Sequence, residues 1–187
     1  MNTETQILKY IILPFVPTFF LILFLILLTC SNGSGSNEAL ANAFFSVPFA
    51  SNVHYTITSE FGYRLDPLDN TPSFHSGIDI AAPEGTFILA SADGVVEQTG
   101  FSDSLGNFVH IKHNFSGITY YSSYGHMLDN SIMVQKGDVV NQGQPIGVIG
   151  ATGRVTGTHL HFTLMTPILS FEEKYLVNPY LVFEGKL

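Results

Sequence analysis

Residues 94–127 read GVVEQTGFSDSLGNFVHIKHNFSGITYYSSYGHM, and this stretch decides the fold. Its Val, Ile, Thr, Phe and Tyr residues gather in short runs separated by Gly, Asn, Asp and Ser, the pattern of strands joined by tight turns. The stretch therefore predicts three consecutive strands, at 94–99, 107–113 and 118–123.

The same pattern extends in both directions from about Ser51 onward. Further strands are predicted at 86–90, 145–150 and 159–165. No stretch of ten or more residues after Leu40 keeps an apolar period of 3.6, so long helices are not expected. Closely spaced strands with short turns favour an all-β fold with an antiparallel sheet core, and the part from Ser51 onward is long enough for one such core.

Composition excludes one class of protein and two kinds of cysteine site. The chain has 187 residues, of which seven are Lys or Arg and fifteen are Asp or Glu, for a net charge of -8. A protein that binds nucleic acid through a basic face is therefore excluded. The single cysteine, Cys30, excludes an intrachain disulfide and a Cys-rich zinc site. Seven histidines direct attention to a metal or acid–base site.

The N-terminal thirty residues predict an export signal or a membrane anchor. Residues 11–28 (IILPFVPTFFLILFLILL) carry no charge and would span about 27 Å as a helix, close to the thickness of a bilayer core. A buried core helix is the alternative. Cys30 follows directly and resembles the cysteine of a bacterial lipobox, with Thr29 where Gly, Ala or Ser is usual. A retained hydrophobic helix or a lipid on Cys30 would each leave the following domain outside the cytoplasm, facing the periplasm or the cell wall.

Residues 31–50 are predicted to link this segment to a folded domain at 51–187. The stretch SNGSGSNEALANA (31–43) has the composition of a flexible tether. The apolar run FFSVPFA (44–50) is expected to dock onto the folded domain.

Two short motifs contain groups that can bind a metal. In a strand, His159 and His161 project to the same face while Leu160 faces the core. His75 and Asp79 stand four residues apart, and Gly77 between them favours a turn running into a strand. Alternatively, His75 is a solvated histidine of a loop and Asp79 is an aspartate of a turn. A catalytic zinc needs three protein ligands, and His75, Asp79 and one histidine of the later pair would supply them.

The other histidines divide into two kinds. His126 ends an aromatic strand in Tyr124-Gly125-His126-Met127, where it could be structural or catalytic. His54, His110 and His113 do not stand in a motif of this kind. His110 alternates with Val109 and Ile111 and is expected to face away from the core.

Four segments together resemble a known family. They are SEFGYR (59–64), HSGIDIAAPEGT (75–86), GNFVHIKHNFSGITYYSSYGHM (106–127) and VQKGDVVNQGQPIGVIGATGRVTGTHLHF (134–162). In this order and with these gaps they resemble the LytM/lysostaphin-type peptidases, zinc enzymes that cut peptide cross-links in bacterial cell walls. The resemblance implies an antiparallel β fold with an active-site groove closed by loops.

The resemblance also assigns roles to five residues. It implies that His75, Asp79 and His161 bind Zn²⁺, and that His126 and His159 are catalytic histidines that do not bind the metal. One of these two would take a proton from the attacking water, and the other would donate a hydrogen bond to the developing oxyanion. Relatives that have become non-catalytic typically lose such positions, whereas this chain keeps all five. We therefore expect a zinc metalloendopeptidase whose partners are peptidoglycan peptides and, through its N-terminal segment, a membrane.

Three other functions are considered beside this one. The first is a non-catalytic cell-wall-binding or hydrolase-activating module tethered to the membrane, which would not need a metal. The second is a zinc peptidase that acts on a protein. The third is a lipoyl-type carrier built on residues 134–147, where Lys136 precedes a Gly-Asp turn; a carrier would not need the histidines.

Overall fold

The computed structural model describes residues 44–183, and these form an antiparallel β fold as predicted. The predicted anchor and tether, residues 1–43, lie outside the described residues. Every strand pairing within 44–183 is antiparallel. Between Phe45 and Phe183, helical structure is limited to η2 (Glu173–Tyr175) and α4 (Pro179–Val182). None of the helices in the described part is both long and apolar enough to cross a membrane.

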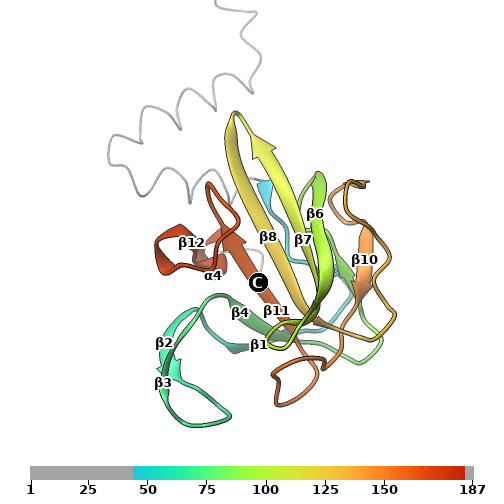
Figure 1. Cartoon of the computed structure of the whole chain (residues 1–187). Helices are drawn as coiled ribbons and strands as arrows, with labels where there is room; N and C mark the ends of the chain where they lie inside the picture. Colours follow the sequence, from blue (N-terminus) through green and yellow to red (C-terminus); the bar gives the residue numbers. More distant parts are fainter. Residues whose placement is uncertain (1–43, 184–187) are drawn as a thin grey trace, which may run out of the picture. The chain divides into compact units, whose positions relative to one another are not determined.

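The main sheet is built around a meander of three long strands, β6, β7 and β8 (Figure 1). Strand order across the sheet is β1-β4-β11-β8-β7-β6-β9, and β12 pairs with the end of β11. The bounds are β1 Thr56–Ser59, β4 Ile78–Ala81, β6 Gly94–Ser102, β7 Gly106–Phe115, β8 Ile118–Met127, β9 Val139–Val140, β11 Leu160–Met165 and β12 Leu176–Val177. β11 enters the sheet between β8 and β4, which brings the end of the chain against two earlier segments.

Two smaller strand pairs lie outside the main sheet. β5 (Phe87–Leu89) pairs with β10 (Pro145–Val148), and β2 (Gly62–Leu65) pairs with β3 (Pro72–His75). The β2–β3 hairpin stands apart from the meander in Figure 1. Its last residue, His75, is followed by a two-residue bend and then by β4, which confirms the predicted turn running into a strand.

All six predicted strands are present, and two of them extend well beyond their predicted ends. β6 continues to Ser102 and β8 to Met127, whereas β10 is shorter than predicted. The sequence did not predict β1 to β4, β9 or β12. These strands have at most four residues each. Their apolar pattern is therefore too short to be recognised, although Ile78 and Ile80 of β4 are fully buried.

β11 separates the core from the face that carries the histidines. Leu160, Phe162 and Leu164 are fully buried on one face, where Phe162 packs edge-on against Tyr124. His161 and Thr163 alternate with them and project from the other face. The prediction that Leu160 faces the core is confirmed.

The apolar run before Ser51 docks onto the folded domain, as predicted. Phe45 is 1% exposed and packs edge-on against the rings of His113 and Tyr120, and Phe49 is also buried. Gln142 Nε2 donates to the carbonyl of Phe44 at 2.8 Å. The segment is thus held by both apolar packing and a hydrogen bond.

The expectation that His110 faces away from the core is wrong, because its side of the sheet is also covered by protein. The residue is 5% exposed, and its ring stacks on Phe108 with centroids 4.5 Å apart. Phe171 approaches the same ring at 6.0 Å. These aromatic side chains cover His110, and burial lowers its pKa to about 4.

Candidate metal centre

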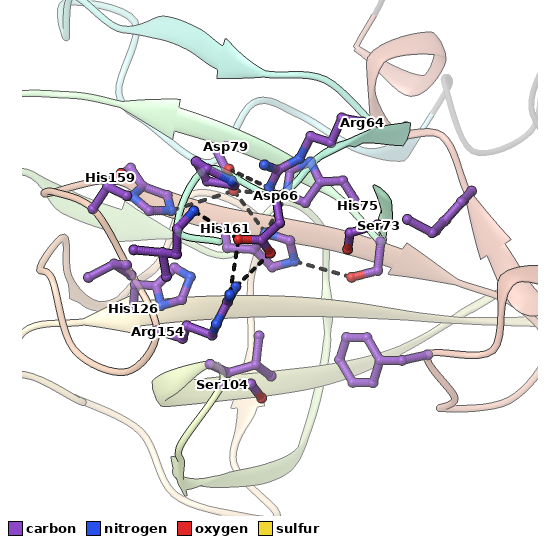
Figure 2. Close-up of a pocket in the computed structure, with 18 residues that line it drawn as sticks. Arg64, Asp66, Ser73, His75, Asp79, Ser104, His126, Arg154, His159 and His161 are labelled. Carbon is purple, nitrogen blue, oxygen red and sulfur yellow. Dashed lines mark hydrogen bonds and ion pairs between the residues drawn. The ribbon is translucent and has the colours of Figure 1, made fainter. Parts of the chain in front are cut away.

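Three of the predicted site residues bring their donor atoms together. His75 ends β3, Asp79 lies in β4, and His161 lies in β11 directly opposite Asp79 in the strand register. His75 Nε2 is 3.1 Å and His161 Nδ1 is 2.9 Å from Asp79 Oδ1, and the two ring nitrogens are 3.0 Å apart. One ligand atom from each residue falls within 4.8 Å of the others. Figure 2 shows the three side chains converging.

The outer contacts of the two imidazoles determine which nitrogens carry protons. His75 Nδ1 is 2.7 Å from the carbonyl of Glu60, which can only accept, so Nδ1 carries the proton and Nε2 a lone pair. His161 Nε2 contacts Thr163 Oγ1 at 3.0 Å and Ser76 Oγ at 3.4 Å. When Nε2 donates to Thr163, Nδ1 also presents a lone pair.

Two lone pairs and a carboxylate oxygen then face one another at about hydrogen-bond distance without a proton between them. Such an arrangement is repulsive unless a cation lies among them. Two neutral imidazoles and one carboxylate are a donor set that zinc prefers, and they leave a fourth position open. The residues present therefore fit a zinc ion.

The charges of the site agree with this donor set. Burial would raise the pKa of Asp79, but its contacts with His161 and His75 outweigh burial and hold that pKa far below its usual range. Burial lowers the pKa of His161. Arg64 Nη2 lies 3.7 Å from Asp79 Oδ2, the carboxylate oxygen that faces away from the two ligand histidines. An ionised carboxylate and a neutral imidazole are the protonation states that metal binding requires.

His126 and His159 lie beside the trio, with ring centroids 4.7 Å apart. His126 Nδ1 is 2.8 Å from the carbonyl of Thr152, and His159 Nδ1 is 2.9 Å from the carbonyl of Gly157. Both rings therefore carry their proton on Nδ1 and present Nε2 as a base. Burial lowers the pKa of His126 to about 4, against the opposing hydrogen bond to Thr152. A neutral His126 can accept a proton at neutral pH.

The backbone at His126 is strained, with a φ of 60°. A non-glycine residue rarely adopts this left-handed conformation, and it persists only where the surroundings enforce it. Here the His126 N–H donates to the carbonyl of Leu105 at 2.6 Å, while the ring is held at Thr152. This backbone conformation directs the His126 side chain towards His159 and His161.

The site opens into a cavity of about 460 Å³. Asp79 and the four histidines of the site line this cavity. Most of the other lining residues lie in loops, in agreement with the predicted loop-walled groove. The wall residues include Arg64, Asp66, Pro67, Leu68, Ser104, Leu105, Arg154, Val155, Thr156 and Phe171. The cavity thus collects residues from five separate parts of the chain.

Sequence reasoning missed several groups that shape this site. The Glu60 carbonyl has no sequence signal, since any residue supplies one. Arg64 stands in the SEFGYR segment and could have been noticed there. Thr163 follows His161 by two residues and so shares its face, which was a usable signal. Arg154 donates from Nη1 to Asp66 Oδ2 at 2.6 Å and from Nη2 to Asp66 Oδ1 at 3.0 Å, and this pairing has no local pattern in the sequence.

An antiparallel sheet carries a His/Asp/His trio and two further imidazoles in an open cavity, an arrangement that fits the class of metal-dependent hydrolases. The chain belongs to peptidase family M23, whose family model matches residues 73–179, more than half of the chain. The resemblance to LytM/lysostaphin-type peptidases is confirmed.

Individual relatives agree with this family. The chain is 44% identical over 110 residues to the DD-carboxypeptidase/endopeptidase Mpg of Neisseria meningitidis, covering 59% of this chain. A zinc-containing peptidase from Vibrio cholerae matches with a TM-score of 0.57 and 36% identity, over 65% of this chain and 36% of that one. The catalytic domain of lysostaphin from Staphylococcus simulans matches with a TM-score of 0.59 and 28% identity, over 73% and 98%.

This chain spans only a small share of the curated relatives. It covers 24% of Mpg and between 22% and 29% of two other curated relatives. The likeness thus concerns the M23 domain of these longer proteins.

Proposed function

We propose that this chain is a zinc metalloendopeptidase that hydrolyses peptide cross-links of bacterial peptidoglycan. The observation that carries the proposal is the convergence of one possible ligand atom each from His75, Asp79 and His161 beside two further histidines. The names of relatives such as Mpg support peptidoglycan as the substrate.

In this proposal His75 Nε2, Asp79 Oδ1 and His161 Nδ1 hold the metal. Zinc bound there would polarise the scissile carbonyl and lower the pKa of the attacking water. His126 and His159 each present Nε2 towards the cavity, so either can take the water's proton. Once protonated, a ring can donate a hydrogen bond to developing negative charge. In this proposal one histidine acts as general base, and the other stabilises the oxyanion when its ring is protonated.

A non-catalytic wall-binding module is the second candidate function. Such a module needs neither metal ligands nor acid–base groups, yet the trio and both neighbouring histidines are assembled in one cavity. This favours an enzyme.

Metal analysis and digestion test the proposal. The full-length chain purified in detergent should bind one zinc, and His75→Ala and His161→Ala should each abolish binding. His54→Ala, at an exposed histidine, is the matched control and should retain the metal. The zinc-loaded chain should release peptides from purified sacculi, identified by mass spectrometry. Zinc retained by both ligand variants would refute the site, and zinc binding without sacculus cleavage would favour a protein substrate or a binding role.

We also propose that residues 1–30 hold a peptidase domain at 51–187 outside the cytoplasm, through the linker 31–50. The uncharged run and Cys30 support this proposal. Cys30→Ser should lose acyl labelling and accumulate as a precursor if the protein is a lipoprotein, and should fractionate with membranes unchanged if the helix is retained. Recovery of the wild-type chain from the cytoplasm would contradict both.

A further inference from the structure

An arginine and a serine of the β2–β3 hairpin face the metal cavity. Arg64 in β2 stands directly opposite Ser73 in β3, so the two side chains share one face of the hairpin. His75 follows Ser73 by two residues in the same strand and lies on that face as well. All three residues line the cavity, and Figure 2 shows Arg64 extending towards Asp79.

The guanidinium of Arg64 has no hydrogen-bond partner within residues 44–183. Its Nη2 lies 3.7 Å from Asp79 Oδ2, which is an ionic contact beyond hydrogen-bond distance. Nε is buried without a partner, whereas Nη1 and Nη2 are not buried. The Ser73 hydroxyl also lacks a partner in the described part of the chain and is not buried. These donors are therefore free to bind a ligand that enters the cavity.

Arg154, the other arginine that lines the cavity, does not have such free donors. Both of its terminal nitrogens donate to Asp66, and Nη2 also donates to Asp69 at 2.9 Å. The Asp66 side chain is only 13% exposed, so two carboxylates already neutralise this guanidinium. Among the described residues that line the cavity, Arg64 is thus the cation whose donors are available to a ligand.

Asp79 does not depend on Arg64 for its negative charge. Burial raises the pKa of Asp79, and its contacts with His161 and His75 outweigh burial and hold that pKa below its usual range. With zinc bound to the trio, the charge of Asp79 would be more than balanced by the metal. The surroundings of Arg64 would then be positive, although the chain as a whole has a net charge of -8. This local positive charge favours an anionic group of a ligand beside Arg64.

We propose that Arg64, with Ser73 beside it, binds a free carboxylate of the substrate peptide next to the scissile amide and so determines specificity. The inference rests on the proposed function and names a feature of its substrate. A planar guanidinium pairs with a carboxylate through two parallel N–H groups, and the serine hydroxyl can donate a further hydrogen bond. Because Arg64 faces Oδ2 of Asp79 while Oδ1 faces the ligand histidines, the carboxylate it binds lies close to the metal centre.

Two peptides test this inference. They share one cross-link sequence and differ only in whether the carboxyl group next to the scissile amide is free or a carboxamide. The zinc-loaded full-length chain should show a kcat/KM about 10- to 100-fold higher on the free acid, the range for a charge-assisted hydrogen-bonded pair. In Arg64→Gln this ratio should fall to about one. Arg64→Lys keeps the charge but not the planar fork and should recover only part of the ratio, and Ser73→Ala should lower it by a smaller factor.

Arg154→Gln is the matched control, because it removes the cavity arginine that is already paired. This variant should retain the preference for the acid peptide. Metal analysis of each variant ensures that zinc-loaded chains are compared. If Arg64→Gln lowered kcat/KM equally on both peptides, Arg64 would act only by positioning Asp79, and the inference would be wrong.

Binding without turnover separates this inference from the proposed function. Calorimetry uses the zinc-loaded His126→Ala chain, in which cleavage should be slow. This chain should bind the acid peptide about 10- to 100-fold more tightly than the amide, and the double variant with Arg64→Gln should show no preference. Such a result would support Arg64 even if the wild type cleaved neither peptide. Equal binding of both peptides by His126→Ala would refute the inference even if the wild type cleaved both.

Discussion

Replacing Thr163 by Val should weaken zinc binding without changing the shape of the core. Thr163 is fully buried, and its Oγ1 lies 3.0 Å from His161 Nε2. Valine has nearly the same volume but no hydroxyl, so His161 Nε2 would keep only Ser76 Oγ, at 3.4 Å, as a partner. Loss of such an outer partner of a metal ligand typically lowers affinity 10- to 100-fold, which is about 1.4–2.7 kcal/mol.

The assay is competition for zinc between the full-length chain and a chromophoric chelator. Thr163→Ser is the matched control, because it keeps the hydroxyl while removing a methyl group; it should bind zinc within about threefold of the wild type. Urea unfolding of the zinc-free chains checks that all three fold. An affinity of Thr163→Val equal to that of the wild type would show that Thr163 does not orient His161, and would refute the proton assignment at the site.

Three further predictions follow from the same structure. His126→Ala and His159→Ala should each retain zinc and slow cleavage by about 10²- to 10⁴-fold; metal loss in either would place that histidine among the ligands. Gly77→Ala should destabilise the fold by at least about 1–3 kcal/mol in urea unfolding, because its Cβ would overlap the Phe162 carbonyl, whereas Gly157→Ala meets nothing within 4 Å and should unfold like the wild type. Burial lowers the pKa of His113 to about 4. Below pH 6.5 the unfolded chain therefore binds more protons than the folded one. The contribution of His113 to stability should fall by up to about 3 kcal/mol between pH 6.5 and 4, and His110 and His126, whose pKa values burial also lowers to about 4, should add to the fall in this window. A pH series that is flat between pH 6.5 and 4 would contradict the burial argument.

The central meander could be predicted from sequence because its strands are long and apolar. β7 and β8 have ten residues each, and Val, Ile, Phe and Tyr recur along both of them between the turns that bound them. The strands around the metal centre are different. β3 and β4 have four residues each and are partly exposed, and their positions depend on pairing with β2, β1 and β11. Such pairing is a property of the tertiary structure and leaves no local pattern.

The candidate ligands could be named from sequence, but the groups that orient them could not. The His75–Asp79 and His159–His161 spacings are local, and strand geometry indicates which side chains share a face. Asp66 and Arg154 stand 88 residues apart in the chain, and the loops that join them are set by strand pairings elsewhere. The sequence therefore indicates what the site contains, and the fold decides which contacts its side chains make.

The histidines of the cavity show how this division operates. His75, His126 and His159 each direct Nδ1 to a backbone carbonyl, those of Glu60, Thr152 and Gly157. The fold itself thus fixes their proton on Nδ1 and leaves Nε2 for chemistry, and no side-chain substitution can remove those acceptors. His161 is the exception, because it faces Asp79 with Nδ1 and so depends on a hydroxyl, that of Thr163, to hold its proton on Nε2. The protonation of the metal centre can therefore be perturbed at Thr163 without moving the main chain.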